Sequence, residues 1–301
     1  MKLSNKNTLA VKRNYNHNLP IKKCRYFIII FFILCVVFNY AAEAQYLNPL
    51  LAKKNQFTVG LGTSYLQTVD FQFSPNIYQG VRNQLHLGYS NKLKRGIFAT
   101  HFNMFGGTLM PLSGTTLEIY AKETDFYGVE TNESIKLELS QMGVNIEIGY
   151  LHKLPSPATT RTTFYVGSSL EENLTFTPGF LSIGTINYAS LNVKTRLDYI
   201  LKNGKPLIFQ LDIPAVSVVT RMPYHNSPNI PGKSVLAGFF TGNNDIKTLE
   251  HFQNPRFLVK YPLLVRKRVA LDISYQGSWL HYYKPENLTH TASQLSIGLN
   301  F

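Results

Sequence analysis

Histidines and glycine-rich turns are the first places in this sequence to look for chemistry. Seven histidines follow residue 44, and none is paired at the i, i+4 spacing of a helical metal site. They are His86, His101, His152, His225, His251, His281 and His290. Gly60-Leu61-Gly62 lacks the strand–turn–helix context of a dinucleotide-binding fingerprint. We therefore expect no metal site and no cofactor.

Eight charged residues fall on the polar positions of segments in which polar and apolar residues alternate. The acids are Glu147, Asp198, Asp212 and Asp272, and the bases are Lys194, Arg196, Arg256 and Lys260. Alternate residues of a strand share one face, so these side chains would line one interior surface, the lumen. Balanced charges in a narrow lumen would pair and close it, because an unpaired buried charge is costly. In the alternative, a narrow conducting pore, the same residues would form the lining.

The N-terminus predicts export. Residues 27–38 form an uninterrupted apolar run that follows Lys22, Lys23 and Arg25 and precedes Ala42-Glu43-Ala44. This pattern indicates a secretory signal peptide over residues 1–44, since the run is too short to span a bilayer as a helix. Its removal takes away seven basic residues and one acid, and lowers the net charge from +13 to +7. Export and the lower charge argue against a nucleic-acid partner.

The mature chain, residues 45–301, contains no cysteine, because Cys24 and Cys35 both lie in the signal peptide. Disulfides, thiol catalysis and cysteine-bound metals are therefore excluded. The fold alone must stabilise the chain.

Alternation with a period of two residues runs through the whole mature chain. It predicts ten strands near 56–67, 83–91, 96–106, 135–151, 162–171, 186–200, 207–214, 256–262, 268–280 and 290–301. Such strands fit either a soluble sandwich or a transmembrane barrel. Aromatic residues near strand ends, as in the interfacial girdles of membrane barrels, and the small polar residues of the second face favour the barrel.

The predicted connections alternate between short and long. Short links fall at 91–95, 154–160, 202–205 and 263–267, and long ones at 68–82, 107–134, 172–185, 215–255 and 281–289. We therefore predict a single all-β domain over 45–301: an antiparallel transmembrane β-barrel of about ten strands, with short periplasmic turns and long external loops. The 107–134 loop is long enough to contain another hairpin, so twelve strands is the alternative.

The C-terminal strand supports this prediction. Its alternating hydrophobic residues and terminal aromatic are Leu295, Ile297, Leu299 and Phe301. They resemble the signal by which outer-membrane β-barrels of Gram-negative bacteria are handed to their insertion machinery. The resemblance implies an outer-membrane location, with membrane lipid and the insertion machinery as partners.

Enzymatic barrels leave no clear signature here. An omptin-like protease would need an Asp-x-His element, whereas Asp212 precedes Ile213-Pro214 and Asp272 precedes Ile273-Ser274. Phospholipase-like barrels use a histidine, a serine and an asparagine. His101, Asn103, Ser140 and Asn145 supply these residue types without a local motif. We therefore expect a non-enzymatic protein.

The segment 215–255 exceeds the usual length of a structureless loop. It contains the apolar stretch 235–240, which would avoid water. One hypothesis is a lid or constriction at the external mouth, with Arg221, Tyr224, His225 and Phe239 as contacts. The alternatives are a further hairpin or an apolar patch on the barrel rim, with 216–220 extending the preceding strand.

The leading functional hypothesis is a porin-like barrel that gives small solutes a narrow or gated passage. The alternative is a closed barrel with a structural or surface-binding role, and a barrel lipase or protease ranks third. Basic residues gather in the predicted short turns and rims, at Lys92, Lys94, Arg95, Lys202, Lys205, Arg266, Lys267 and Arg268. They would contact anionic lipid headgroups, or simply be solvated.

Overall fold

The structure is a computed structural model, and it describes residues 54–72, 74–113, 118–124, 130–136, 139–155, 161–178, 183–221, 232–242, 244–266 and 268–301. The predicted signal peptide therefore lies outside the described residues. So do Tyr224, His225 and Lys267.

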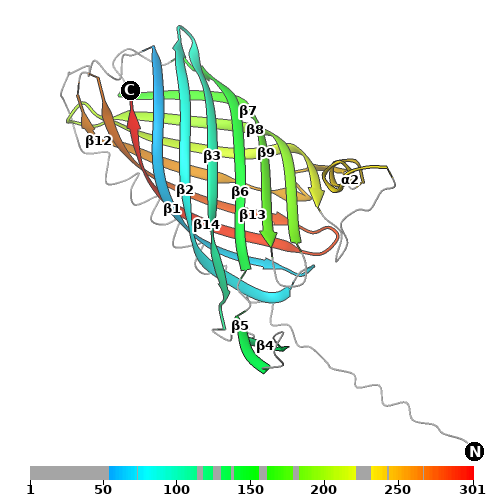
Figure 1. The fold of residues 1–301 in the computed structure, drawn as a ribbon. Helices are drawn as coiled ribbons and strands as arrows, with labels where there is room; N and C mark the ends of the chain where they lie inside the picture. Colours follow the sequence, from blue (N-terminus) through cyan, green and yellow to red (C-terminus); the bar gives the residue numbers. More distant parts are fainter. Residues whose placement is uncertain are drawn as a thin grey trace, which may run out of the picture. The chain divides into compact units, whose positions relative to one another are not determined.

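Ten antiparallel strands form a closed wall (Figure 1). They are β1 (Asn55–Asp70), β2 (Ser74–Leu93), β3 (Gly96–Pro111), β6 (Leu139–Lys153), β7 (Thr162–Pro178), β8 (Ile183–Ile200), β9 (Pro206–Arg221), β12 (Arg256–Val265), β13 (Ala270–Tyr282) and β14 (Leu288–Asn300). Each strand pairs with the next wall strand, and β14 pairs with β1 to complete the circle. The predicted ten-strand barrel is confirmed.

The remaining described elements lie in two connections between wall strands. They are β4 (Glu118–Thr124), β5 (Glu130–Lys136), helix α2 (Val235–Gly242), β10 (Asn244–Thr248) and β11 (Phe252–Gln253). The hairpin suspected within 107–134 exists as β4 and β5, but these strands pair with each other in a separate sheet. The barrel wall therefore keeps ten strands. In the described part of the chain, no helix combines the length and apolar character needed to cross a membrane.

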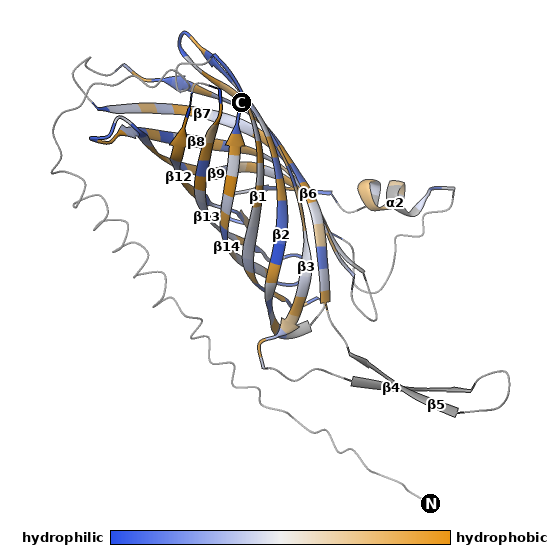
Figure 2. Cartoon of the chain, turned by 60° about the vertical axis from the view of Figure 1, so that its left-hand side comes forward, coloured by the Kyte–Doolittle hydropathy of each residue, from blue (hydrophilic) through white to orange (hydrophobic). Residues whose placement is uncertain are grey.

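Side-chain exposure alternates along the wall strands, as their hydropathy does (Figure 2). Outward-facing Leu61 and Leu170 are 69% and 65% exposed, whereas Glu171, the next residue after Leu170, is 3% exposed. The C-terminal residues Ile297 and Phe301 are also exposed. A closed wall with an apolar exterior and a polar interior is the arrangement of a transmembrane barrel, because lipid covers the exterior.

Both ends of the described barrel chain lie on the same side of the wall, since Phe57 and Phe301 exchange backbone hydrogen bonds. This side, the short-turn end, carries the connections β2–β3, β6–β7, β8–β9 and β12–β13. In the β8–β9 turn, Gly204 adopts a φ of 74°, a conformation that favours glycine. The opposite side, the loop end, carries all the other connections.

Two predicted long loops are wrong. The 68–82 link is reduced to residues 71–73 between β1 and β2, and the 172–185 link to 179–182 between β7 and β8. The exposed apolar side chains of the wall form a band around the exterior, which we call the apolar belt. Beyond this belt the outward face no longer needs to be hydrophobic, so polar residues can also pair as strands. The 215–255 segment is shortened for the same reason, since β9 continues to Arg221.

A β-bulge in β9 changes which residues face inward. Pro214 and Val216 pair with β8, whereas Ala215 between them has no partner there. Even-numbered Asp212 is buried before the bulge, and odd-numbered Ser217 is buried after it. Proline suits a bulge because it has no backbone N–H to donate to the ladder. Even-numbered residues therefore face inward before the bulge and odd-numbered residues face inward after it, and the apolar residues stay on the exterior.

Replacement of Ile297 by Arg tests the lipid-facing surface. Ile297 pairs with Leu61 and Ile273, near the middle of the apolar belt. We expect Ile297→Arg to lower the free energy of unfolding by about 2–4 kcal/mol, measured by urea unfolding in lipid vesicles. Thr291→Arg, level with Trp279 nearer the loop end, is the matched control and should cost at most about 1 kcal/mol. Equal effects at the two depths would contradict the assigned belt.

Candidate functional site

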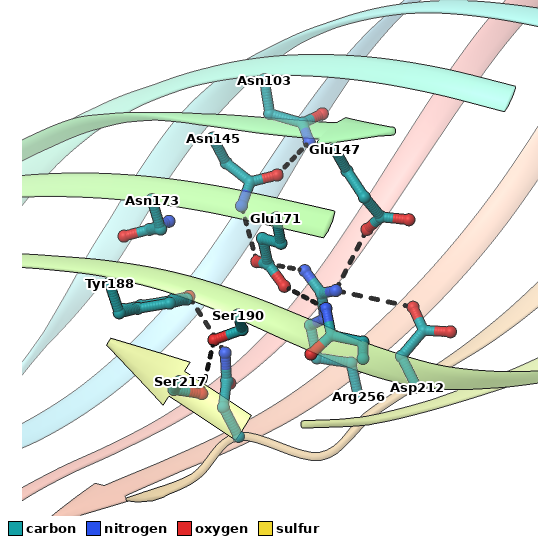
Figure 3. Close-up of polar contacts among 12 residues, drawn as sticks. Asn103, Asn145, Glu147, Glu171, Asn173, Tyr188, Ser190, Asp212, Ser217 and Arg256 are labelled. Carbon is teal, nitrogen blue, oxygen red and sulfur yellow. Dashed lines mark hydrogen bonds and ion pairs between the residues drawn. The ribbon is translucent and has the colours of Figure 1, made fainter. Parts of the chain in front are cut away.

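The buried polar and charged side chains of the described residues gather inside the barrel. Five charged side chains from consecutive wall strands converge there, and Figure 3 labels four of them, Glu147, Glu171, Asp212 and Arg256. The five are Glu147 on β6, Glu171 on β7, Lys194 on β8, Asp212 on β9 and Arg256 on β12, and we call them the ionic layer. Their side chains are only 1–12% exposed, so little water reaches them.

Arg256 is the centre of the ionic layer. Its Nη1 lies 2.6 Å from Oε1 of Glu171, and its Nη2 lies 3.1 Å from Oε2 of Glu147. Nη2 also lies 3.6 Å from Oδ2 of Asp212. Three strands, β9, β8 and β7, separate β12 from β6 around the wall. The Arg256–Glu147 pair therefore bridges wall strands that are not neighbours.

Lys194 is the second cation of the ionic layer. Its Nζ forms an ion pair with Glu147 and lies 3.4 Å from Oδ2 of Asp212. Glu147 and Asp212 thus each face both cations, whereas Glu171 pairs with Arg256. With all five groups ionised, three carboxylates face two cations.

Neutral side chains satisfy the remaining acceptors of Glu171. Asn145 Nδ2 donates to Oε1 at 2.6 Å, and Asn192 Nδ2 donates to Oε2 at 2.8 Å. Asn103 in turn donates to Asn145 at 3.2 Å, and its own Oδ1 lies 2.6 Å from Nδ1 of His86. Hydrogen bonds therefore extend the layer around the wall from β12 to β2.

The eight charged residues predicted to line the lumen divide into three groups. Glu147, Lys194, Asp212 and Arg256 meet in the ionic layer. The other four form separate pairs: Arg196 makes a bidentate contact with Asp198 at 2.6 and 2.9 Å, and Lys260 pairs with Asp272. Asn300 also donates to Asp272, at 2.5 Å.

Glu171 is the member of the ionic layer that sequence reasoning missed. It lies at the boundary of the predicted strand 162–171, beside a second glutamate, Glu172, which is exposed. The signal was available in the alternation, because Ser169 and Glu171 share a face opposite Leu170. Arg82 was missed too. It donates to Gln141 at 2.8 Å inside the barrel.

Apolar side chains fill the interior nearer the loop end. One cluster comprises Ile186, Tyr188, Val219, Phe252, Leu280, Tyr282 and Leu288. A second comprises Leu66, Leu109 and Leu139, with Tyr78 and Ala292 packed against it. We call the two clusters the apolar layer. The apolar layer is held together by packing, whereas the ionic layer is held together by charge pairing.

Phe252 enters the apolar layer from the long connection rather than from a wall strand. It is fully buried, with its ring 5.0 Å from that of Tyr188 and 6.1 Å from that of Tyr282. Asn254, two residues later, donates to the Tyr188 hydroxyl at 3.0 Å. The connection between β9 and β12 therefore contributes side chains to the barrel interior.

The same connection completes the wall at the loop end. β9 pairs with β12 only over Ile208–Asp212, and beyond the bulge its edge pairs with β10. β13 likewise passes from β12 to β11. Asp245 of β10 accepts a hydrogen bond from Tyr282 at 3.4 Å and lies 3.7 Å from Lys284. Side-chain contacts thus join β10 to the end of β13.

Two of the four residues proposed for the external mouth are described. Arg221 pairs with Asp70 and donates to the backbone oxygens of Lys284 at 2.9 Å and Glu286 at 2.5 Å, so it ties three loop-end segments together. Phe239 is buried on α2, which contacts β9. The hairpin alternative is also present, because β9 pairs with β10 and α2 precedes β10 in their connection.

No family model matches the sequence, and no curated protein matches it. Similar solved structures include the translocator domain of autotransporter NalP from Neisseria meningitidis, with 6% identity and a TM-score of 0.43 over 93% of this chain and 95% of that chain. The outer membrane protease OmpT from Escherichia coli has 8% identity and a TM-score of 0.44 over 87% and 99%. The attachment invasion locus protein Ail of Yersinia pestis has 8% identity and a TM-score of 0.32 over 83% and 100%.

The geometry of the chain itself defines its class. The wall is closed and has an even number of strands, its exterior is apolar and its interior is polar. The two longest connections, β3–β6 and β9–β12, both lie at the loop end. The chain therefore has the fold of a transmembrane β-barrel, the arrangement that is typical of outer-membrane barrels of Gram-negative bacteria. In barrels of this class the short turns are periplasmic and the long connections are external, and we name the short-turn end and the loop end accordingly.

The described residues contain no group of three or more His, Cys, Asp or Glu side chains arranged to hold a metal ion. The acids of the ionic layer are instead engaged by Arg256 and Lys194. The ionic layer therefore connects wall strands across the interior of the barrel.

Removal of Arg256 tests the ionic layer. Arg256→Met would leave three buried carboxylates facing Lys194 alone, so we expect the free energy of unfolding to fall by about 3–5 kcal/mol. Urea unfolding in lipid vesicles, followed by gel migration with and without heating, measures this loss. Arg95→Met, at an exposed short-turn position, is the matched control and should change stability by less than about 0.5 kcal/mol. Similar values for the two variants would show that the layer is not energetically coupled.

Proposed function

We propose that this outer-membrane barrel is non-conducting and non-enzymatic, and that it acts by binding a partner at its external end. The observation that supports the proposal is the presence of two layers of buried side chains inside the barrel. A solute would have to pass both the apolar layer and the ionic layer, which lie one above the other along the barrel axis. Ten strands enclose a bore only slightly wider than the eight-stranded kind that side chains fill.

The external end supports a binding role because it holds every described element other than the ten wall strands, namely β4, β5, α2, β10 and β11. Ile246 on β10 is 74% exposed, and Phe240 on α2 and Leu249 after β10 are also exposed. Ile246 lies beside Val218 and continues the outward face of the wall, where lipid could cover it. Phe240 and Leu249 lie on segments that leave the wall, where lipid does not explain their exposure. An apolar partner surface at this end would explain it.

The non-enzymatic part of the proposal is supported by the partners of two interior serines and of His86. Ser190 and Ser217 share a hydrogen bond of 2.7 Å with each other, and His86 is bonded to Asn103. Hydrolysis by a serine would require the hydroxyl to contact a general base.

A gated passage is the second candidate, and one observation favours it. Phe252 and Asn254 belong to the connection between β9 and β12, so a movement of this connection would withdraw them from the interior. The ionic layer beneath would then control passage. Its excess of one carboxylate predicts a preference for cations.

Conductance in planar bilayers separates the two candidates. We expect the wild-type protein to insert, as shown by heat-modifiable gel migration, and to give no discrete current steps. A variant with Phe252→Ala, Tyr282→Ala, Glu171→Ala and Arg256→Ala removes two large side chains from each layer and should conduct. Discrete steps from the wild-type protein would overturn the non-conducting proposal and favour the gated passage.

A further inference from the structure

Basic side chains ring the periplasmic end of the barrel. Each of the four short turns carries at least two of them, and another precedes β1. In the described residues they are Lys54, Lys94, Arg95, Lys153, Arg161, Lys202, Lys205, Arg266 and Arg268. We call this set the basic rim. Most of its members are exposed, and Lys205 extends to the backbone oxygen of Leu263 at 2.5 Å.

Exposed side-chain acids do not balance the basic rim in the described part of the chain. The acids nearest to it are Asp198 and Asp272, which point into the barrel and pair with Arg196 and Lys260. The periplasmic end therefore presents a field of one sign.

Exposed leucines accompany the basic residues of three short turns. Leu93 precedes Lys94, Leu154 follows Lys153, and Leu263 and Leu264 precede Arg266, with exposures between 39% and 49%. In a turn surrounded by water, these leucine side chains would gain nothing from their exposure. At a membrane surface, however, leucine enters the acyl region while the adjacent lysine or arginine reaches the headgroups.

Aromatic residues fix the depth of the rim. Phe57 and Tyr89 lie with their rings 4.9 Å apart at the start of β1 and near the end of β2, and Tyr150 and Phe301 are exposed at the same end. Such a girdle lies at the boundary between acyl chains and headgroups. The basic rim follows it immediately along the chain, which places its charges at the depth of the lipid phosphates.

We propose that the basic rim binds anionic phospholipid headgroups, of the phosphatidylglycerol class, in the periplasmic leaflet of the outer membrane. Phosphate oxygens complement the lysine and arginine side chains. The leucines select a lipid over an acidic periplasmic protein, because only a lipid supplies the headgroup and the apolar medium together. This inference is independent of whether the barrel conducts.

Tryptophan quenching by brominated lipid tests the proposal. Trp279 is the single tryptophan of the chain and lies outward, nearer the external end. A variant with Leu154→Trp and Trp279→Phe moves the probe to the basic rim, and the wild-type protein serves as the matched control. Each is refolded into phosphatidylcholine vesicles that contain either brominated phosphatidylglycerol or brominated phosphatidylcholine.

At the rim we expect phosphatidylglycerol to bind about fivefold more strongly than phosphatidylcholine, the effect of about one basic residue at a membrane surface. At Trp279 we expect no preference. Adding Lys153→Gln and Arg95→Gln to the rim variant should abolish the preference, with heat-modifiable migration unchanged. Equal quenching by the two lipids at the rim, or a preference that survives the two Gln substitutions, would overturn the proposal.

Discussion

The constraint on which this structure depends is the absence of water in the bilayer, which leaves every backbone N–H and C=O to be paired within the protein. The β14–β1 pairing meets it by joining the last strand to the first, so that the wall has no open edge in the membrane. Closure then separates two environments. Lipid accepts only apolar residues such as Leu170, and the charges on the other face must find partners inside.

The ionic layer shows how these charges are accommodated. Arg256 contacts carboxylates from three strands. Asn145 and Asn192 complete the hydrogen bonds of Glu171. The apolar layer uses ordinary hydrophobic packing around Phe252. Both layers reduce the space available to a solute, and for this reason we place the function at the external end rather than in the bore.

The two ends of the barrel differ in ways that follow from their surroundings. The periplasmic end has short turns, with basic residues beside leucines such as Leu93 and Leu154, which suits a headgroup boundary. The external end extends its strands beyond the apolar belt and adds β10 and β11 to the wall between β9 and β13, with α2 preceding β10. Arg221 holds this end together through its bonds to Asp70 and to the β13–β14 turn. An external end with these additional elements is a suitable platform for recognition.

The class of fold could be read from the sequence because strand alternation is local: each residue's face follows from its neighbours, and the ten predicted strands each overlap a wall strand of the structure. The alternation also grouped Lys194, Asp212 and Arg256 on polar positions. Only the tertiary structure decided that these three meet Glu147 and Glu171, whereas Lys260 pairs with Asp272. That choice depends on the register between distant strands and on the width of the closed barrel. It likewise decided that Phe252 fills the interior and that a bulge at Ala215 reverses the parity of β9, because both follow from packing between segments that the local pattern does not connect.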